Sequence, residues 1–272
     1  MMKDRQMTWE EAVQWLKSQP DMQDLVKYCY YDDPLIESAE RYYSLTEWKA
    51  IQEILSAYTV GSALDIGAGR GISSYALAKD GWKVTALEPD KSNLVGAGAI
   101  RKLANDAGLD IKIVESFGEK LPFIDNSFDL ILARQVLHHS RNLDEFCREV
   151  YRVLKPKGIL LALREHVISK KSDLKLFLAS HPLHQFYGGE NAFILKEYKK
   201  AILKSGMKIN KTFAPYESDI NLFPLTLEKL KQDLAQKLKF KITNWEFRVL
   251  IFLLNLRNRQ PGRLYSFMGY KP

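Results

Sequence analysis

The chain has 272 residues, of which 46% are hydrophobic, and it carries two cysteines and a formal net charge of +7. That length fits one large α/β domain with insertions or a small cap, and Cys29 and Cys147, far apart and without a C-x-x-C partner, suggest neither a disulfide framework nor a zinc knuckle. The longest apolar run, Val249 to Leu254, is far shorter than the ~20 residues of a membrane-spanning helix. Because Met1 to Pro20 also lacks the pattern of a signal peptide, we expect a soluble, cytoplasmic protein.

The positive charge is concentrated near the C-terminal end. Residues 196–272 carry 16 Lys and Arg against 6 Asp and Glu, whereas residues 1–195 carry 24 against 27. Such an excess could attract an anionic acceptor or RNA through its long-range field. Alternatively, lysines such as Lys196, Lys199 and Lys200 simply solvate outer helix faces, and we favour this interpretation for most of them.

Residues 62–166 alternate short apolar runs with stretches of helical periodicity, which is typical of β-α-β units and a parallel sheet. Strands are predicted at 63–66, 83–87, 111–114, 128–133 and 159–163, with helices between them at 70–79, 91–107 and 143–154. The last helix and strand are separated by a Pro and Gly stop at residues 155–158.

The pattern after Val167 is weaker. A helix at 173–179 leads into His181 to Phe193, a segment that resembles the loop of a binding site. Beyond it the sequence predicts helices at 193–205, 225–238 and 244–256 and strands at 208–213 and 263–270.

A glycine-rich turn, Gly67-Ala68-Gly69-Arg70-Gly71, lies between the first strand and its helix. Glycines let the backbone bend tightly and approach a ligand without Cβ clashes. Glu88 follows 21 positions after Gly67 at the end of the second strand, where a carboxylate can accept both hydrogen bonds of a ribose diol. These residues predict a nucleoside-binding site.

Two features separate this turn from that of nicotinamide-dependent enzymes. Its glycine spacing is G-x-G-x-G, and Asp65 comes just before it. A pyrophosphate needs open amides and a helix dipole, and a nearby carboxylate would repel it. Asp65 therefore favours a cationic ligand without phosphate.

Further motifs follow in order, and together they carry a resemblance. They are Glu88-Pro89-Asp90, Glu119-Lys120-Leu121-Pro122-Phe123, Asn126-Ser127-Phe128-Asp129, Leu137-His138-His139 and Leu154-Lys155-Pro156-Lys157-Gly158. With residues 65–71 they resemble the class I S-adenosylmethionine-dependent methyltransferases, in particular the group (type 11) similar to ubiquinone and menaquinone biosynthesis methyltransferases. The resemblance covers about residues 60 to 167, and the final Tyr265 to Pro272 is similar to that family's closing antiparallel strand.

The resemblance implies a Rossmann-like, doubly wound and mostly parallel seven-stranded sheet with an antiparallel last strand. We expect residues 1–58 to form an N-terminal helical lid and residues 59–167 to form the S-adenosylmethionine-binding core. Residues 168–272 would supply the acceptor-site insertion, a C-terminal helical insertion and the closing strands of the same sheet.

The resemblance also assigns the cofactor site. Gly67 and Gly69 would pack against S-adenosylmethionine, Asp65 would anchor its amino-acid end, and Glu88 would hold the ribose. Many relatives have an Asp that contacts adenine where this chain has Phe117, so Ser116 or the backbone would substitute. The remaining predicted cofactor contacts are Ala68, Gly71, Pro89, Arg134 and Arg41.

Acceptor chemistry is expected after the fourth and fifth strands, because ligands of an open α/β sheet bind beyond the carboxyl ends of its strands. All five histidines of the chain lie between 138 and 184. His139 or His166, with Glu165 beside it, could remove a proton from an acceptor hydroxyl. His138 and Arg164 would contact the acceptor, although His138 and His139 could instead only cap or pack a helix start.

Two segments outside the core carry further predictions. Tyr187, Glu190 and Asn191 combine a ring, an acid and an amide, which suits a hydroxyl-rich acceptor such as a sugar. Tyrosines between 28 and 43 could cover the cofactor with Arg41 near its carboxylate, or could be ordinary helix packing. His181 and His184 lack a carboxylate at a fixed spacing, so no metal site is predicted from them.

The sequence thus predicts methyl transfer from S-adenosylmethionine to a small-molecule acceptor, anionic or sugar-like, with S-adenosylhomocysteine as product. An O-methylation is the leading form. An RNA methyltransferase and a non-catalytic cofactor-binding scaffold remain as alternatives, although no recognisable RNA-binding module is present. The apolar residues at 247 and 249–254 are too continuous for one exposed stripe, so they are either buried or paired in a homodimer.

Overall fold

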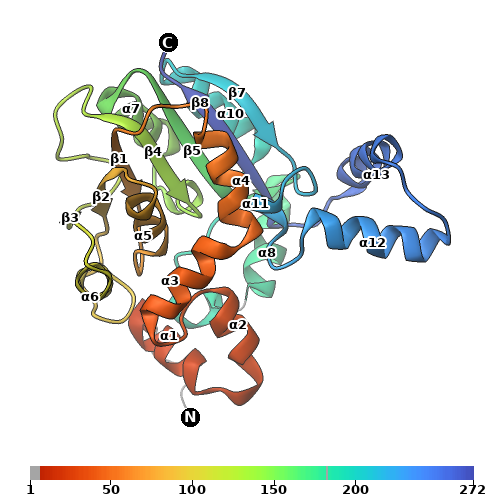
Figure 1. The fold of residues 1–272 in the computed structure, drawn as a ribbon, viewed down its shortest axis with the longest axis horizontal. Coiled ribbons are helices and arrows are strands. Elements are labelled where there is room, and N and C mark those ends of the chain that lie inside the picture. The colour runs from red at the N-terminus through yellow and green to blue at the C-terminus, as the bar shows by residue number, and fades with distance from the viewer. Residues whose placement is uncertain (1–6, 182) are drawn as a thin grey trace.

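A computed structural model describes residues 7–181 and 183–272 of the chain, so part of the expectation for Met1 to Pro20 and Pro182 of the predicted loop lie outside the described residues. A twisted sheet with helices on both faces forms its centre (Figure 1). The strands are β1 (Ser62–Ile66), β2 (Lys83–Leu87), β3 (Ile111–Val114), β4 (Phe128–Arg134), β5 (Leu154–Ile168), β6 (Phe193–Ile194), β7 (Lys208–Phe213) and β8 (Arg263–Tyr270).

Seven of these strands follow the order β3-β2-β1-β4-β5-β8-β7, and the short β6 pairs with the end of β5. Strand β8 runs antiparallel to both of its neighbours, β5 and β7, whereas β1 to β5 are parallel. The predicted Rossmann-like sheet with an antiparallel last strand is therefore confirmed. The strand order reverses between β1 and β4, which is where ligands bind in open α/β sheets.

Helices cover the two faces of the sheet because successive strand residues point to opposite sides. In β4, Leu130 and Leu132 face one buried cluster while Ile131 and Ala133 face the other. The first cluster is completed by α3 (Leu35–Ser44), α4 (Thr46–Leu55), α5 (Ile72–Lys79) and α6 (Ala97–Ala107), and the second by α7 (Leu143–Val153) and α10 (Leu195–Lys204).

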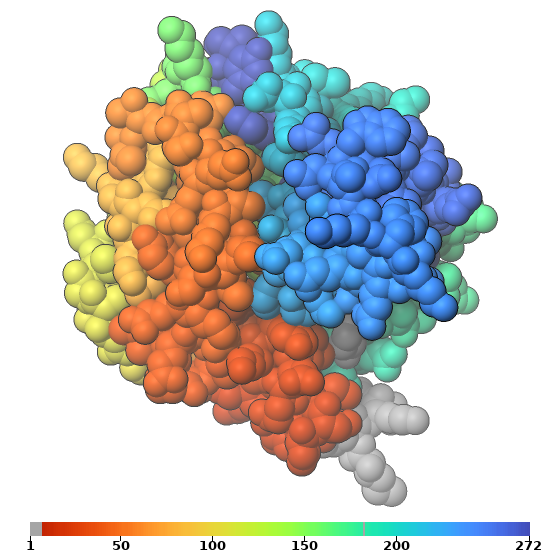
Figure 2. All heavy atoms as spheres, turned by 45° about the vertical axis from the view of Figure 1, so that its right-hand side comes forward, coloured from red at the N-terminus to blue at the C-terminus, as the bar shows by residue number. Residues whose placement is uncertain are grey.

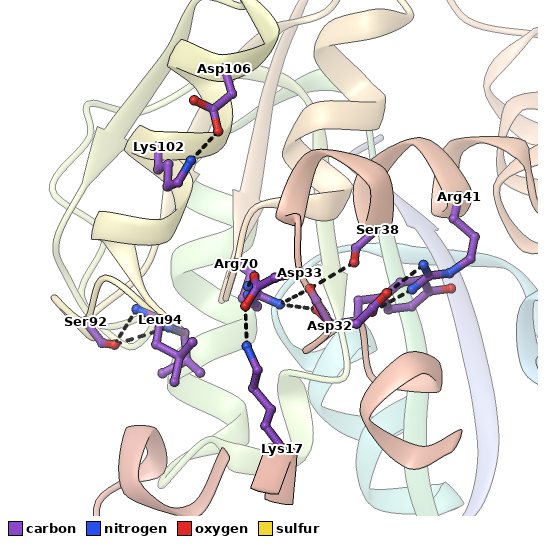
Figure 3. Close-up of polar contacts among 12 residues, drawn as sticks. Lys17, Asp32, Asp33, Ser38, Arg41, Arg70, Ser92, Leu94, Lys102 and Asp106 are labelled. Atoms are coloured by element: carbon purple, nitrogen blue, oxygen red, sulfur yellow. Dashed lines mark hydrogen bonds and ion pairs between the residues drawn. The ribbon is translucent and has the colours of Figure 1, made fainter. Parts of the chain in front are cut away.

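Two elements differ from their predicted bounds by more than two residues. Strand β5 begins at Leu154 rather than Ile159, because the expected stop at residues 155–158 forms a bulge: Phe128 pairs with Leu154, and Leu130 already pairs with Ile159. The helix expected from residue 91 begins only at Ala97. The Ser92 hydroxyl accepts hydrogen bonds from the amides of Leu94 and Val95, and this local turn replaces the first helical turn (Figure 3).

The remaining helices lie around this core. They are α1 (Trp9–Ser18), α2 (Gln23–Tyr28), α8 (Leu174–Ser180), α9 (His184–Tyr187), α11 (Asp219–Leu222), α12 (Leu227–Leu238) and α13 (Asn244–Arg257), with 3-10 turns at Pro20–Met22, Leu137–His139 and Lys171–Asp173. Helices α12 and α13 project from one side of the domain as a hairpin (Figure 1), which Figure 2 brings forward. Every residue of these two helices is at least partly exposed. Among the described helices, none combines the length and apolarity needed to cross a bilayer.

Candidate active site

A cavity of about 1090 Å³ lies at the carboxyl end of the parallel strands. Its walls include Gly67, Glu88 and Gln135, which directly follow β1, β2 and β4, and His166, which lies in the last part of β5. This is the edge of the sheet at which the strand order reverses, the position expected for ligands of a doubly wound fold.

The glycine-rich turn forms one wall of the cavity. Gly67 and Gly69 have φ values of +64° and +55°, a left-handed conformation that favours glycine. A Cβ on Gly67 would lie 2.6 Å from Cγ2 of Val136, whereas a Cβ on Gly69 would have no described atom within 4 Å. The turn is held against β2, since the amide of Gly67 donates to the carbonyl of Leu87 at 2.8 Å. Sequence and backbone geometry thus leave an open surface above Gly69.

Glu88 lies beside this turn, at the end of β2. Its carboxylate accepts hydrogen bonds from the amides of Gly69 at 2.7 Å and Asp90 at 3.0 Å, and its side chain also lines the cavity. Burial raises the pKa of Glu88 to about 7 in spite of these two hydrogen bonds. The carboxylate is therefore fixed in position at the cavity wall.

Asp65 supplies a second buried carboxylate to the same wall. It accepts a hydrogen bond from the Ser74 hydroxyl at 2.6 Å. Burial raises the pKa of Asp65 to about 7, and the negative charge of Glu88 adds to the shift. Two buried carboxylates in one wall gain from a positively charged ligand and would repel a pyrophosphate. These residues fit the ribose and the α-ammonium group of S-adenosylmethionine.

Histidines line the other side of the cavity, after β4 and in the last part of β5. Nδ1 of His139 lies 3.0 Å from the carbonyl of Gly189, and Nδ1 of His166 lies 2.9 Å from the carbonyl of Gly262. A carbonyl only accepts, so both Nδ1 atoms carry the proton and both Nε2 atoms keep their lone pairs. Burial lowers the pKa of His139, and burial lowers that of His166 to about 3. Both imidazoles are therefore neutral acceptors.

Glu165 lies behind this wall rather than in the cavity. Its carboxylate accepts from the amides of Val136 and Leu137 at 3.1 Å and of His138 at 3.0 Å, and Nδ1 of His138 is 2.7 Å away. The prediction that Glu165 is a catalytic residue beside the histidines is corrected, because these four groups use its lone pairs and its side chain is fully buried. Glu165 instead positions His138, which does line the cavity.

Glu190 reaches the histidines from the predicted loop. Tyr187 donates a short hydrogen bond to its Oε1, while Oε2 lies 3.6 Å from Nε2 of His138. Burial opposes ionisation of Glu190, but the adjacent His138 and the other nearby imidazoles outweigh it and lower its pKa. Burial also disfavours the charge on His138, yet Glu165 and Glu190 raise its pKa to about 9. The wall therefore pairs a cationic imidazole with carboxylates on both sides.

The N-terminal helices close the cavity. Arg70, in the glycine-rich turn, donates to the carbonyls of Tyr30 and Asp32 at 2.7 and 3.0 Å and contacts Asp33 at 2.6 Å (Figure 3). Trp9 packs edge-on against Tyr187 with ring centroids 4.4 Å apart. The segment before β1 is thus attached to both halves of the cavity.

Arg41 does not reach the cavity, contrary to its predicted role near the cofactor carboxylate. Its guanidinium forms two hydrogen bonds of 2.8 and 2.7 Å with Asp32, and Figure 3 shows it directed toward that side chain. A bidentate pair of this kind satisfies both groups. Arg41 therefore fixes the loop after α2.

Arg134 and Arg164 line the cavity, as predicted, but their guanidinium groups bind other parts of the chain. Arg134 binds the buried Glu47 through Nε at 2.6 Å and Nη2 at 3.1 Å. Arg164 donates to the carbonyls of Ile220 and Phe223 at 2.7 and 3.2 Å. Both residues thereby tie other parts of the chain to the sheet edge.

The other predicted site residues fall into two groups. Gly71 and Asn191 are outside the cavity lining of the described residues; Gly71 has a φ of +85° and serves the turn into α5. Lining residues are Asp65, Gly67, Ala68, Gly69, Glu88, Pro89, Ser116, Arg134, His138, His139, Arg164, His166, Tyr187 and Glu190. The cavity also contains Trp9, Cys29, Phe223 and Pro224, which the sequence analysis missed because they are distant in sequence and belong to no motif.

Comparison with known proteins agrees with this geometry. Residues 64–162 match the family model described as "Methyltransferase domain". Residues 64–162 therefore form a methyltransferase domain. The methyltransferase domain thus includes β1 to β4, most of β5 and the two buried carboxylates.

Similar proteins extend beyond this range. The chain is 28% identical over 150 residues to a ubiquinone biosynthesis O-methyltransferase of Agrobacterium fabrum, a match that covers 54% of this chain and 59% of that relative. A putative sarcosine dimethylglycine methyltransferase of Galdieria sulphuraria shares the fold with a TM-score of 0.58 and 21% identity, covering 88% of this chain and 89% of that one.

A geranyl diphosphate C-methyltransferase of Streptomyces coelicolor A3(2), solved with Mg²⁺, geranyl diphosphate and S-adenosylhomocysteine, gives a TM-score of 0.61 at 13% identity, covering 89% and 85%. At these identities the two solved structures show the fold alone. The chain spans about three-fifths of the length of the curated relative named above.

Proposed function

We propose that the chain transfers a methyl group from S-adenosylmethionine to an oxygen atom of a small, hydroxyl-rich acceptor. One observation carries the proposal: a single cavity joins the carboxylate wall of the methyltransferase domain to a wall that contains the neutral imidazoles of His139 and His166. The oxygen acceptor is supported by the relative from Agrobacterium fabrum, whose name is that of an O-methyltransferase.

On the carboxylate wall, Glu88 would accept both ribose hydroxyls, while Gly67 and Gly69 let the nucleoside approach the backbone. Asp65 would face the α-ammonium group of the amino-acid end, and Ser116 and Pro89 would border the adenine. When bound, S-adenosylmethionine supplies an electrophilic methyl group on a sulfonium. The task of the protein is then to align the acceptor and exclude water.

On the imidazole wall, His139 would accept the proton of the acceptor hydroxyl at Nε2. Its Nδ1–H is bound to the Gly189 carbonyl, which fixes the ring and leaves Nε2 as an acceptor. Tyr187 and Glu190 would hydrogen-bond neighbouring hydroxyl groups. All three proteins named above are called methyltransferases, and none of their names mentions RNA. The alternatives of an RNA methyltransferase and of a non-catalytic scaffold therefore gain no support from them.

A labelled-methyl assay tests the proposal. Purified protein is incubated with S-adenosylmethionine carrying a labelled methyl group and with fractions of small molecules from a cell extract. Wild-type protein should label one fraction, His139→Gln should lower the rate at least about 100-fold, and binding of S-adenosylhomocysteine should stay unchanged in this variant. Labelling confined to RNA, or no labelling by a protein that binds the cofactor, would contradict the proposal.

We also propose a homodimer formed through α13. Trp245, Phe252 and Leu256 of this helix are 73%, 60% and 53% exposed, and such a set of large apolar side chains is typical of an interaction surface. The mass in solution should fall from dimer to monomer in Phe252→Glu. The control Lys237→Glu, on the neighbouring α12, should leave the dimer intact. A monomeric wild type would overturn this proposal.

A further inference from the structure

Two imidazoles and one carboxylate meet on the acceptor side of the cavity. His166 lies in the last part of β5, His181 follows α8, and Glu190 comes from the loop after α9. One donor atom from each of the three lies within 4.8 Å of the other two, and all three residues line the cavity. The three side chains come from separate segments, so the fold rather than the local sequence brings them together.

Each of the three offers a lone pair to this point. His166 donates Nδ1–H to the Gly262 carbonyl at 2.9 Å, which leaves its Nε2 as an acceptor. Nε2 of His181 lies 3.9 Å from Oε1 of Glu190, and the buried Nδ1 of His181 has no hydrogen-bond partner among the described residues. A backbone carbonyl that orients the second nitrogen is the usual support for a histidine that binds a metal.

Glu190 is the second observation that points to a ligand. Its side chain is only 6% exposed, and its Oε2 accepts no hydrogen bond from the part of the chain that the structure describes. The imidazole of His138 lies 3.6 Å from this oxygen, too far for a hydrogen bond, so burial removes hydration that no donor replaces, which is costly. A cation between Glu190 and the imidazoles would satisfy this oxygen.

We propose that His166, His181 and Glu190 form a binding site for a divalent transition-metal ion of the Zn²⁺ class. Two imidazoles and one carboxylate are a common ligand set for such ions, and they leave coordination positions free. Mg²⁺ prefers an all-oxygen environment and would fit this set poorly. The free positions face the cavity, where an acceptor oxygen would reach them. Metal binding does not rest on the proposed function, since it requires neither cofactor nor transfer.

Co²⁺ serves as the probe, because its absorption spectrum reports coordination by nitrogen and oxygen ligands. Titration of the chelator-treated protein should show one ion per chain, and competition with Zn²⁺ should displace it. Loss of an outer-shell partner alone costs about 10–100-fold in metal affinity, so His181→Gln and Glu190→Gln should each weaken binding at least about 100-fold. Mg²⁺ in excess should not compete.

His184→Gln is the matched control, since it removes a histidine three positions from His181 that is outside the set. It should bind Co²⁺ like the wild type. Unfolding temperatures separate misfolding from ligand loss, because Zn²⁺ should raise that of the wild type and of His184→Gln but not that of His181→Gln.

Three results would overturn the site. The first is a wild type that binds no ion at one equivalent, which would leave Glu190 as the ion-pair partner of His138. The second is unaltered affinity in His181→Gln and Glu190→Gln. The third is loss of the ion in His139→Gln with full retention in His181→Gln, which would assign it to His138, His139 and Glu190, the neighbouring set that shares this carboxylate.

Discussion

The two halves of the cavity are built in different ways. The carboxylate wall comes from one β-α-β unit, in which Ile66 pairs with Leu87 in the parallel register, so that Gly67 and Glu88 necessarily lie side by side. The imidazole wall is assembled from separate segments: His139 contacts Gly189, 50 positions away, and Glu165 contacts His138 across 27. Local sequence determines the first wall, and tertiary packing determines the second.

The difference has a consequence for stability. The cofactor wall is held by backbone pairing and by glycine conformations, whereas the acceptor wall depends on a few buried polar side chains. Removing one of those side chains leaves several groups without partners at once. Substitutions in the two halves should therefore have effects of different size and kind.

The largest effect is expected for Glu165→Ala. This change leaves the buried amides of residues 136–138 and Nδ1 of His138 without an acceptor, so the free energy of unfolding should fall by about 3–5 kcal/mol. Chemical denaturation measures it. Glu165→Gln, which keeps an acceptor oxygen, should lose less. A loss below about 1 kcal/mol for the alanine variant would show that the acceptor wall does not depend on this carboxylate.

Gly67→Ala tests the cofactor wall. The new Cβ would lie 2.6 Å from Val136 at a φ of +64°, so unfolding should become easier by about 1–3 kcal/mol, and cofactor affinity should fall at least about tenfold. Gly108→Ala is the control, with a φ of +63° and no described atom within 4 Å of its Cβ. If both variants behave alike, steric contact at Gly67 plays no part.

A pH dependence of cofactor binding is expected from Asp65 and Glu88. Both pKa values are raised to about 7, mainly by burial, so both carboxylates lose their charge below that pH. Affinity for the cationic S-adenosylmethionine should fall at least about tenfold from pH 8 to pH 6. Calorimetry on Glu88→Gln, which should reduce this dependence, separates the contribution of the protein from that of the ligand.

The same two pKa shifts also affect the stability of the ligand-free protein, but stability falls with rising pH, whereas cofactor affinity rises. Between about pH 4 and pH 7 the folded state binds these two protons more tightly than the unfolded state does. Their contribution to the free energy of unfolding therefore decreases as the pH rises through this range. If Glu88→Gln leaves the pH dependence of the free energy of unfolding unchanged in the ligand-free protein, burial does not raise the pKa of Glu88 as described.

The smallest effect is expected for Asn191→Ala. Asn191 was predicted to bind the acceptor, but it lies outside the cavity lining, unlike the neighbouring Glu190. Methyl transfer should stay within about twofold of wild type, and the free energy of unfolding within about 0.5 kcal/mol. Glu190→Ala should lower turnover strongly at unchanged cofactor affinity. Equal losses in both variants would return Asn191 to the acceptor site.

The sequence predicted the sheet and the carboxylate wall because both depend on local patterns: apolar runs, a glycine turn and an acid at a strand end. It misplaced Glu165 for a specific reason. Arg164 has a φ of +59°, and the pairing of β5 with β8 shifts between Ala162 and Glu165. The side-chain alternation of the strand therefore cannot be extended to residues 164–166, so the sequence could not place Glu165 behind the wall.

Tertiary pairing explains the other two failures. Arg41 was expected near the cofactor, but the bidentate contact with Asp32 depends on how the loop after α2 folds back. The set of His166, His181 and Glu190 could not be predicted, because no local spacing relates His166 to Glu190. Long-range contacts of this kind leave no periodic signal.

Calorimetric titration with S-adenosylhomocysteine tests the central claim most directly. The wild type should bind one molecule per chain. Glu88→Ala should weaken binding at least about 100-fold, since two charge-assisted hydrogen bonds to the ribose are lost, while His139→Ala on the opposite wall should change affinity by less than about threefold. An unaltered affinity in Glu88→Ala, or a wild type that ignores the ligand at millimolar concentration, would contradict the account.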